Sequence, residues 1–206
     1  FGYGWGAGTW GLGTWGTGGT TLAGMRLWSQ SNFGEDLFFL HRNGALYYWD
    51  ASGGINTRGV LVSSLGGAVQ VPTVANIAFV SDIFRFAFCF GVNAVGSSDL
   101  DPMLIRWSDQ EDISDWNPTA TNQSGSLSLS EGTTIIQAIQ ARQEVLVWTD
   151  AAIYGFQYLG APEVWGATLL GSNTTIASPN AAIYSNNIAY WMGKNKFYFY
   201  DGTVKT

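Results

Sequence analysis

Residues 37–42 of this chain, LFFLHR, form a predicted β-strand with apolar side chains on both of its faces. Because side chains alternate along a strand, the two faces carry the pairs Leu37 with Phe39 and Phe38 with Leu40. The Asn43-Gly44 dipeptide that follows favours a type I′ turn, which predicts a hairpin with a second strand over residues 45–49. A strand that is apolar on both faces needs a protein layer on each side. We therefore expect this hairpin to be sandwiched between two layers.

Similar groups of short apolar strands recur along the chain. The further predicted strands are 77–80, 84–90, 103–107, 135–139, 145–148, 152–158, 181–184, 188–192 and 197–200. The central strands begin near residues 37, 84, 144 and 188, and irregular repeats of about 40 to 50 residues are typical of propeller blades. A blade packs both faces on its neighbours, whereas a sheet of a β-sandwich buries one. The sequence therefore predicts an all-β fold that is a β-propeller or part of one, with about four blade-like repeats of three to four antiparallel strands.

Residues 134–145, TIIQAIQARQEV, are compatible with a second assignment. Their apolar spacing fits a helix, whereas the β-branched run Thr133-Thr134-Ile135-Ile136 favours a strand. We interpret the segment as a strand.

The first 24 residues are a Gly- and Trp-rich segment, and residues 25–206 are assigned to the propeller. The segment contains overlapping G-x-G-x-x-G patterns, but a dinucleotide site needs a strand before this loop and a helix after it. Glycines let the backbone bend and indoles supply contact area, so Trp5, Trp10 and Trp15 are candidate contacts with a neighbouring subunit. Intrinsic disorder is the alternative.

Composition bears on the partners of the chain. The net charge is −6 with nine Lys and Arg, which argues against a role in gripping nucleic-acid phosphates. Charged residues make up 12% and aromatic residues 15% of the chain, so we expect burial against partner chains. No apolar run of about 18 residues is present, so no membrane insertion is expected. The chain starts and stops as if in mid-structure, and we expect it to be a fragment of a longer polypeptide.

Six of the fifteen acidic residues lie between residues 99 and 115, and four of them are close together at Asp109, Glu111, Asp112 and Asp115. A calcium loop counted from Asp109 would need Gly at its sixth position and Glu at its twelfth, and both are missing. Two of the four carboxylates could serve glycoside hydrolysis, but the spacing does not select a pair. A solvated loop is the simpler interpretation.

Three other residues have candidate chemistry but favour structural roles. His41 is the only histidine, so a multi-histidine metal site is excluded and a structural role on its strand is expected. Cys89 cannot form an internal disulfide and is expected to fill a core, and Arg85 is expected to make an ion pair or to stack on an aromatic ring. We predict no catalytic residue, no metal site and no cofactor, and hence no enzyme.

Residues 104–129 (LIRWSDQEDISDWNPTATNQSGSLSL) and 190–206 (YWMGKNKFYFYDGTVKT) resemble the tail nozzle proteins of short-tailed bacteriophages, also called tail tubular protein B or the DNA-stabilisation tail protein. The GAGTWGLGTWG run is similar to glycine-aromatic segments of the same family. The resemblance implies a β-propeller in a homohexameric nozzle of the virion tail, assembled in the cytoplasm of the bacterial host. It also implies contacts with head-to-tail adaptor proteins and with tail fibres or spikes, and a channel for the retention and ejection of DNA. Family members are usually longer than this chain.

An acidic balance suits such a channel, because a lumen that repels phosphate lets double-stranded DNA pass without specific binding. We therefore expect Asp109, Glu111, Asp112 and Asp115 to be candidates for a position facing the lumen. Two alternatives remain. One is a carbohydrate-binding β-propeller in which exposed Trp and Tyr side chains stack on host glycans, and the other is a polysaccharide hydrolase that uses a carboxylate pair.

Overall fold

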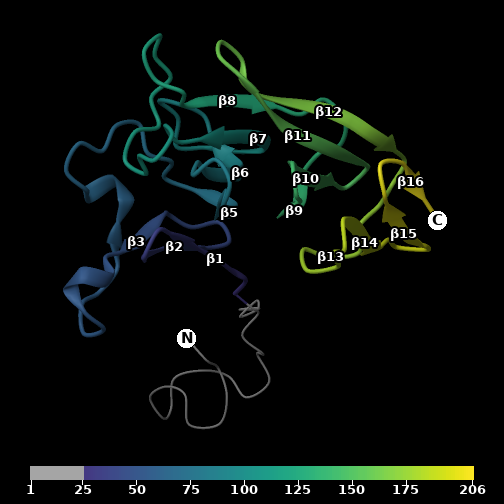
Figure 1. The fold of residues 1–206 in the computed structure, drawn as a ribbon, viewed down its shortest axis with the longest axis horizontal. Helices are drawn as coiled ribbons and strands as arrows, with labels where there is room; N and C mark the ends of the chain where they lie inside the picture. The colour runs from purple at the N-terminus through teal and green to yellow at the C-terminus, as the bar shows by residue number, and fades with distance from the viewer. Residues whose placement is uncertain (1–25) are drawn as a thin grey trace, which may run out of the picture.

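The computed structural model describes residues 26–206, and in this range the chain is all-β, as predicted. Its sixteen described strands form four antiparallel sheets of four strands each. Each sheet consists of four strands that are consecutive in the sequence (Figure 1). Two short 3-10 helices, η1 (Ala51–Gly53) and η2 (Val62–Ser64), flank the fourth strand.

The sheets are numbered in chain order. Sheet 1 contains β1 (Trp28–Phe33), β2 (Asp36–His41), β3 (Tyr47–Trp49) and β4 (Val60–Leu61). Sheet 2 contains β5 (Ala75–Val80), β6 (Ala87–Asn93), β7 (Leu100–Trp107) and β8 (Gly125–Ser128). Sheet 3 contains β9 (Ile135–Gln140), β10 (Glu144–Thr149), β11 (Ala152–Gly160) and β12 (Val164–Ser172). Sheet 4 contains β13 (Ala182–Ser185), β14 (Ile188–Met192), β15 (Phe197–Tyr200) and β16 (Val204–Lys205).

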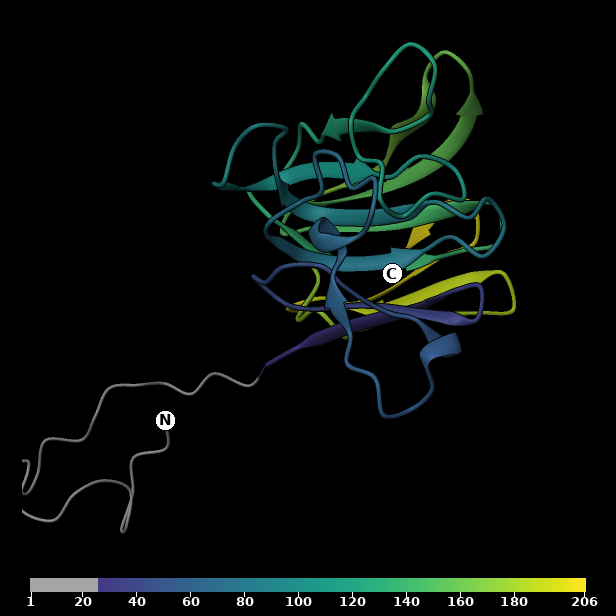
Figure 2. The ribbon, with the colours of Figure 1, turned by 90° about the vertical axis from the view of Figure 1, so that its left-hand side faces the viewer.

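The first strands of the sheets lie toward a common centre. β1 contacts β5, and β9 contacts both β6 and β13, while the last strands β8 and β12 contact each other farther out. In Figure 1 the four sheets follow one another around this centre, from sheet 1 at the lower left to sheet 4 at the lower right. Figure 2, from the side, shows sheets 1 and 4 at the bottom of the view and sheets 2 and 3 above them. This radial order of four-stranded meanders is that of β-propeller blades, which confirms the predicted fold class.

Three hydrophobic cores lie between successive sheets, one for each pair. Strand β6 contributes to two of them, because Phe88 packs toward sheet 3 while Ala87 and Cys89 pack toward sheet 1. Strand β10 does the same, with Val147 in the core shared with sheet 2 and Trp148 in the core shared with sheet 4. Sheets 2 and 3 are therefore covered on both faces, as expected for apolar strands between two layers.

The two end sheets differ from the middle pair. Phe38 and Leu40 of β2 are fully buried in the core with sheet 2, whereas Leu37 and Phe39 point to the other face and belong to none of the three cores. The expectation that this hairpin is sandwiched is thus met on one face only within residues 26–206. Sheet 4 likewise buries Ala189 and Trp191 against sheet 3 and leaves its other face open.

The structure corrects several strand boundaries. Strand β6 begins at Ala87 instead of residue 84, because the preceding residues form a turn in which Arg85 has a φ of 55°. Asn43 has a positive φ but Gly44 does not, so the turn after β2 is not the predicted type I′ turn, and β3 begins only at Tyr47. The segment that was also compatible with a helix is strand β9, so the β-branched residues at its start decide its conformation.

Candidate functional site

The open face of sheet 1 is a layer of aromatic side chains. Strand register places the following residues on it: Trp28, Gln30, Asn32, Leu37, Phe39, His41, Tyr47, Trp49 and Leu61. The Phe39 and Tyr47 rings stack with centroids 5.5 Å apart, and the Trp28 ring lies 6.4 Å from that of Phe39. The side chain of Trp28 is 57% exposed although it is one of the largest apolar groups in the chain. We call this set face 1.

The open face of sheet 4 is more apolar and more exposed. Register across its strands places these residues on it: Ile183, Ser185, Ile188, Tyr190, Met192, Phe197, Phe199 and Lys205. Ile183 is 65% exposed and Phe197 is 75% exposed. The Lys205 ammonium lies 5.6 Å above the Phe199 ring, and it also binds the carboxylate of Asp201 at 2.6 Å. We call this set face 4.

These two faces are unusually apolar for a surface in contact with water. Four large side chains of face 4, of about 200 Å² each and roughly half exposed, leave on the order of 400 Å² of apolar surface. Face 1 adds a somewhat smaller area, because its rings cover one another. The largest apolar patch on a typical monomer is about 300 to 600 Å² and often has a function, and residues 26–206 carry two patches on this scale, at opposite ends of their stack of sheets.

The four predicted acidic residues gather in the loop of residues 108–124, which joins β7 to β8, the last strand of sheet 2. Three of them shape the loop. The Asp109 carboxylate accepts hydrogen bonds from the backbone N–H groups of residues 110 and 123, and the Asp112 carboxylate accepts from the backbone and hydroxyl of Ser114. The Asp115 carboxylate accepts from the Asn122 amide, and Glu111 lies 3.5 Å from Arg85. The loop also contacts the β5–β6 turn, because the backbone N–H of Glu111 and the side chain of Gln110 donate to the carbonyl oxygens of Arg85 and Phe84. A position of the four acidic residues facing a lumen stays a prediction.

The buried guanidinium of Arg106 anchors this loop. It donates hydrogen bonds to the carbonyl oxygens of Asn93 at 3.1 Å, Gln70 at 2.6 Å and Trp116 at 3.0 Å. Burial lowers the pKa of Arg106. Since Trp116 is itself buried in the core between sheets 1 and 2, the guanidinium ties the loop to that core. Sequence reasoning missed this role, although an arginine inside the apolar strand LIRW was a signal for it.

The remaining single residues have the structural roles expected of them. Arg85 pairs with Glu111, and its guanidinium lies 5.6 Å from the Phe33 ring centroid, so both expected contacts are confirmed. Cys89 is fully buried, and burial raises the pKa of its thiol. The half-buried His41 ring lies edge-on to Trp28 at 5.7 Å. Trp5, Trp10 and Trp15 lie outside the described residues.

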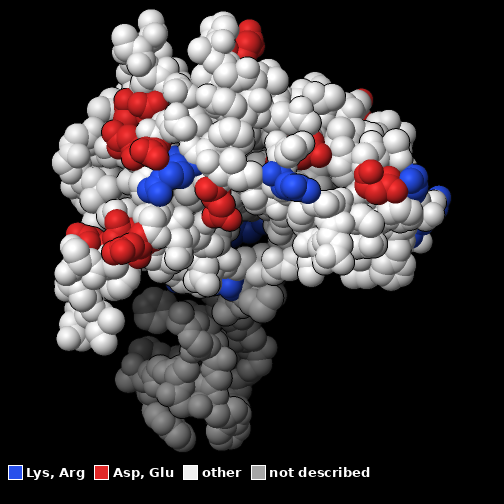
Figure 3. Space-filling model, viewed as in Figure 1, with Lys and Arg blue, Asp and Glu red and all other residues white. Residues whose placement is uncertain are grey.

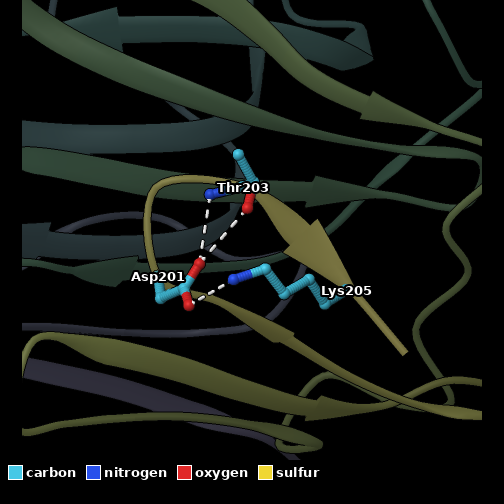
Figure 4. Close-up of polar contacts among 3 residues, drawn as sticks. All are labelled: Asp201, Thr203 and Lys205. Carbon is cyan, nitrogen blue, oxygen red and sulfur yellow. Dashed lines mark hydrogen bonds and ion pairs between the residues drawn. The ribbon is translucent and has the colours of Figure 1, made fainter.

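A pocket of about 280 Å³ lies between the β9–β10 turn and sheet 4. Its polar lining includes Arg142, Glu144, Tyr184, Tyr200 and Asp201. Burial, together with the nearby Glu144 carboxylate, raises the pKa of Tyr200. Figure 4 shows the Asp201 carboxylate bound to the backbone and hydroxyl groups of the following Thr203 and to the ammonium of Lys205. Aromatic rings beside hydrogen-bonding groups are the chemistry of a sugar subsite.

Most of the face drawn in Figure 3 is uncharged, and its acidic groups are interspersed with basic ones around a central hollow. Among residues 26–206, no cluster of three or more His, Cys, Asp and Glu side chains could hold a metal ion. The same range contains no helix of the length and apolarity needed to cross a membrane.

Comparison with known proteins gives structural similarities only. No protein-family model matches the chain, and a search of curated proteins gave no significant match. The crystal structure of Hsv2 from Kluyvelomyces marxianus is similar over 84% of this chain and 46% of that chain, with 8% identity and a TM-score of 0.43. The computationally designed Ika4 protein is similar over 86% of this chain and 87% of its own, with 16% identity and a TM-score of 0.40. The chain thus spans less than half of Hsv2, and its fold is assigned from its own sheet order and cores.

Proposed function

We propose that this chain is a structural subunit of the tail nozzle of a short-tailed bacteriophage. In this role it assembles with copies of itself into a ring, forms part of the channel for DNA retention and ejection, and carries tail fibres or spikes. The observation that carries the proposal is the pair of uncovered aromatic layers, faces 1 and 4, at the two ends of the sheet stack. The resemblance of residues 104–129 and 190–206 to nozzle proteins supplies the identity of the assembly.

The surface chemistry of the described residues supports a role built on contacts. Several large apolar side chains are more than 40% exposed, among them Trp28, Tyr190 and Phe197. Each Å² of apolar surface that stays in water costs about 25 cal/mol of free energy. A neighbouring subunit that covers this surface would recover that free energy. Aromatic residues are also the side chains that dominate binding energy at protein interfaces.

The proposed role also implies which partners the chain contacts and where in the virion it lies. The subunit contacts other copies in a ring, six as the resemblance implies, and adaptor proteins above it in the virion tail. Double-stranded DNA passes through the channel without being held, since the chain has an excess of acidic residues. The subunit catalyses no reaction, and its assembly takes place in the cytoplasm of the bacterial host.

The test uses virions purified from that host. Mass spectrometry should find the chain in a fixed ratio to the other structural proteins, and immunogold labelling should place it at the tail. Particles made without the chain should fill their heads with DNA and then lose it. If the chain is missing from virions that are otherwise complete, the proposal is wrong.

A second candidate function is the binding of host glycans, which the polar pocket beside Tyr184 and Tyr200 favours. An isolated monomer with this function would bind a sugar saturably, and Tyr184→Ala would abolish binding without changing the mass of the protein in solution. A glycan array followed by calorimetry on the full chain would detect it. The absence of saturable binding in both measurements would exclude this candidate.

A further inference from the structure

We propose that face 4 of one copy packs on face 1 of a second copy, and that the reciprocal contact closes a single ring of eight sheets. The inference rests on the self-assembly part of the proposed function and names the surfaces that make it. It concerns the body of residues 26–206, whose two ends carry the uncovered faces.

The order of the internal interfaces sets the direction of this contact. Sheet 1 packs on sheet 2, sheet 2 on sheet 3 and sheet 3 on sheet 4, each time through the second face of one sheet and the first face of the next. Face 4 is the second face of the last sheet, and face 1 is the first face of the first sheet. A second copy placed with its sheet 1 on face 4 therefore continues the interfaces already present. In Figure 1 no described sheet lies between sheet 1 and sheet 4 at the bottom of the view.

Head-to-tail contacts of this kind form rings when the rotation between copies closes. Propellers typically contain four to eight blades, so two copies of four sheets fall within the usual range. A closed pair uses both faces of each copy, so three pairs in an assembly of six copies would meet through other surfaces. An isologous contact, with face 1 on face 1, would instead reverse the order of the sheets.

The chemistry of the two faces matches that of the internal interfaces. Between sheets 3 and 4, Trp148 and Trp191 meet edge-on at 5.6 Å, and Trp191 stacks on Tyr198. Face 1 offers comparable rings at Trp28 and Phe39. Face 4 offers mainly apolar partners for them, and its one charged side chain, Lys205, is already paired with Asp201.

The area is adequate for a stable pair. Each contact joins one face 1 to one face 4, and a closed ring contains two such contacts. The four faces together bury on the order of 1,500 Å² of surface, close to the roughly 1,600 Å² of a standard stable interface. A second copy therefore accounts for both faces at once.

The test places one charge on each face in turn, in the full 206-residue chain. Phe197→Glu alters face 4, Trp28→Glu alters face 1, and both side chains are more than half exposed, so the fold should tolerate the changes. Leu159→Glu is the matched control, because Leu159 is 60% exposed and lies on strand β11 of sheet 3, which carries neither face. Light scattering coupled to gel filtration measures the mass of each variant, and circular dichroism checks its fold.

The wild-type chain and Leu159→Glu should assemble with an even number of copies. Phe197→Glu and Trp28→Glu should each raise the dissociation constant by about 30-fold or more and run as monomers. A mixture of the two variants should form a one-to-one complex, because one intact face 1 and one intact face 4 remain in it. This rescue by mixing is the result that only the head-to-tail contact predicts.

Three outcomes would overturn the inference. If the wild type assembles and the two face variants keep its mass, the faces are not the contact, although self-assembly stands. If either variant alone still forms pairs through its intact face, the contact is isologous. If the wild type is monomeric, a second copy does not cover the faces, and the self-assembly part of the proposed function fails as well. Conversely, absence of the chain from virions would refute the proposed nozzle function but would not bear on the contact between face 4 and face 1.

Discussion

Replacing Trp165 by alanine should greatly destabilise the chain, because this side chain sits at the centre of the core between sheets 2 and 3. Its indole is 3% exposed. The ring lies edge-on to Phe88 with centroids 4.8 Å apart and stacks on Phe156 at 5.1 Å. It is also 5.4 to 5.6 Å from three further aromatic rings, those of Phe84, Phe86 and Tyr158.

The expected loss follows from the volume removed and the ring contacts broken. Truncating a buried Trp to Ala costs about 3 to 5 kcal/mol, and the aromatic contacts place Trp165 at the upper end of this range. A loss of about 5 kcal/mol is a third or more of the roughly 5 to 15 kcal/mol of a typical domain. Trp165→Phe should cost much less, about 1 to 2 kcal/mol, because within residues 26–206 the buried indole N–H has no hydrogen-bond partner to lose.

The assay is urea unfolding followed by far-ultraviolet circular dichroism, at a chain concentration low enough to keep copies apart. Trp28→Ala is the control, because it removes the same side chain from a face with no layer over it, and it should cost about 1 kcal/mol. If Trp165→Ala fails to fold, Trp165→Phe still gives the comparison. A Trp165→Ala variant no less stable than Trp28→Ala would refute the assignment of a sandwiched core between sheets 2 and 3.

Three further predictions address other parts of the structure. Arg106→Met should lower the free energy of unfolding by about 3 to 5 kcal/mol in urea titrations, because three carbonyl oxygens lose their donor, two of them in buried contacts; an unchanged value would contradict the anchoring role. Burial opposes ionisation of Asp150, but hydrogen bonds from Thr133 and Thr134 outweigh it and lower its pKa, so this stabilisation is present above the unfolded pKa and is lost as pH falls through the lower folded value. Between about pH 5 and pH 2, Asp150→Asn should therefore lose less stability than the wild type, and equal losses would argue against the network. Cys89 should react with a thiol reagent only as fast as the chain unfolds, and rapid labelling of the native protein would contradict its burial.

The strands that sequence could predict are those with two apolar faces or a strong alternation. Strands β14 and β15 were predicted with their exact bounds, residues 188–192 and 197–200, and β10 within one residue at each end, because these strands are rich in aromatic and β-branched side chains. The strands that escaped prediction, β1, β4, β8, β12 and β16, are first or last in their sheets. An edge strand such as β8, GSLS, buries little, so its sequence carries little apolar signal.

The candidate site was only partly accessible to sequence reasoning. Leu37 and Phe39 showed that β2 is apolar on both faces, but the pattern could not reveal that one layer is missing from residues 26–206. The acidic residues were identified as a group, yet their role in shaping turns depends on partners such as Asn122, which no spacing rule selects. Arg106 was missed because its partners are backbone carbonyl oxygens, and these have no sequence signature.

An electron cryomicroscopy reconstruction of the assembled full chain tests the central claim most directly, because it counts the sheets around one axis. The account predicts eight sheets from two copies, with Phe197 of one copy against the Trp28 side of the other. A map in which both end sheets remain open to solvent, or in which residues of the same copy cover them, would contradict it.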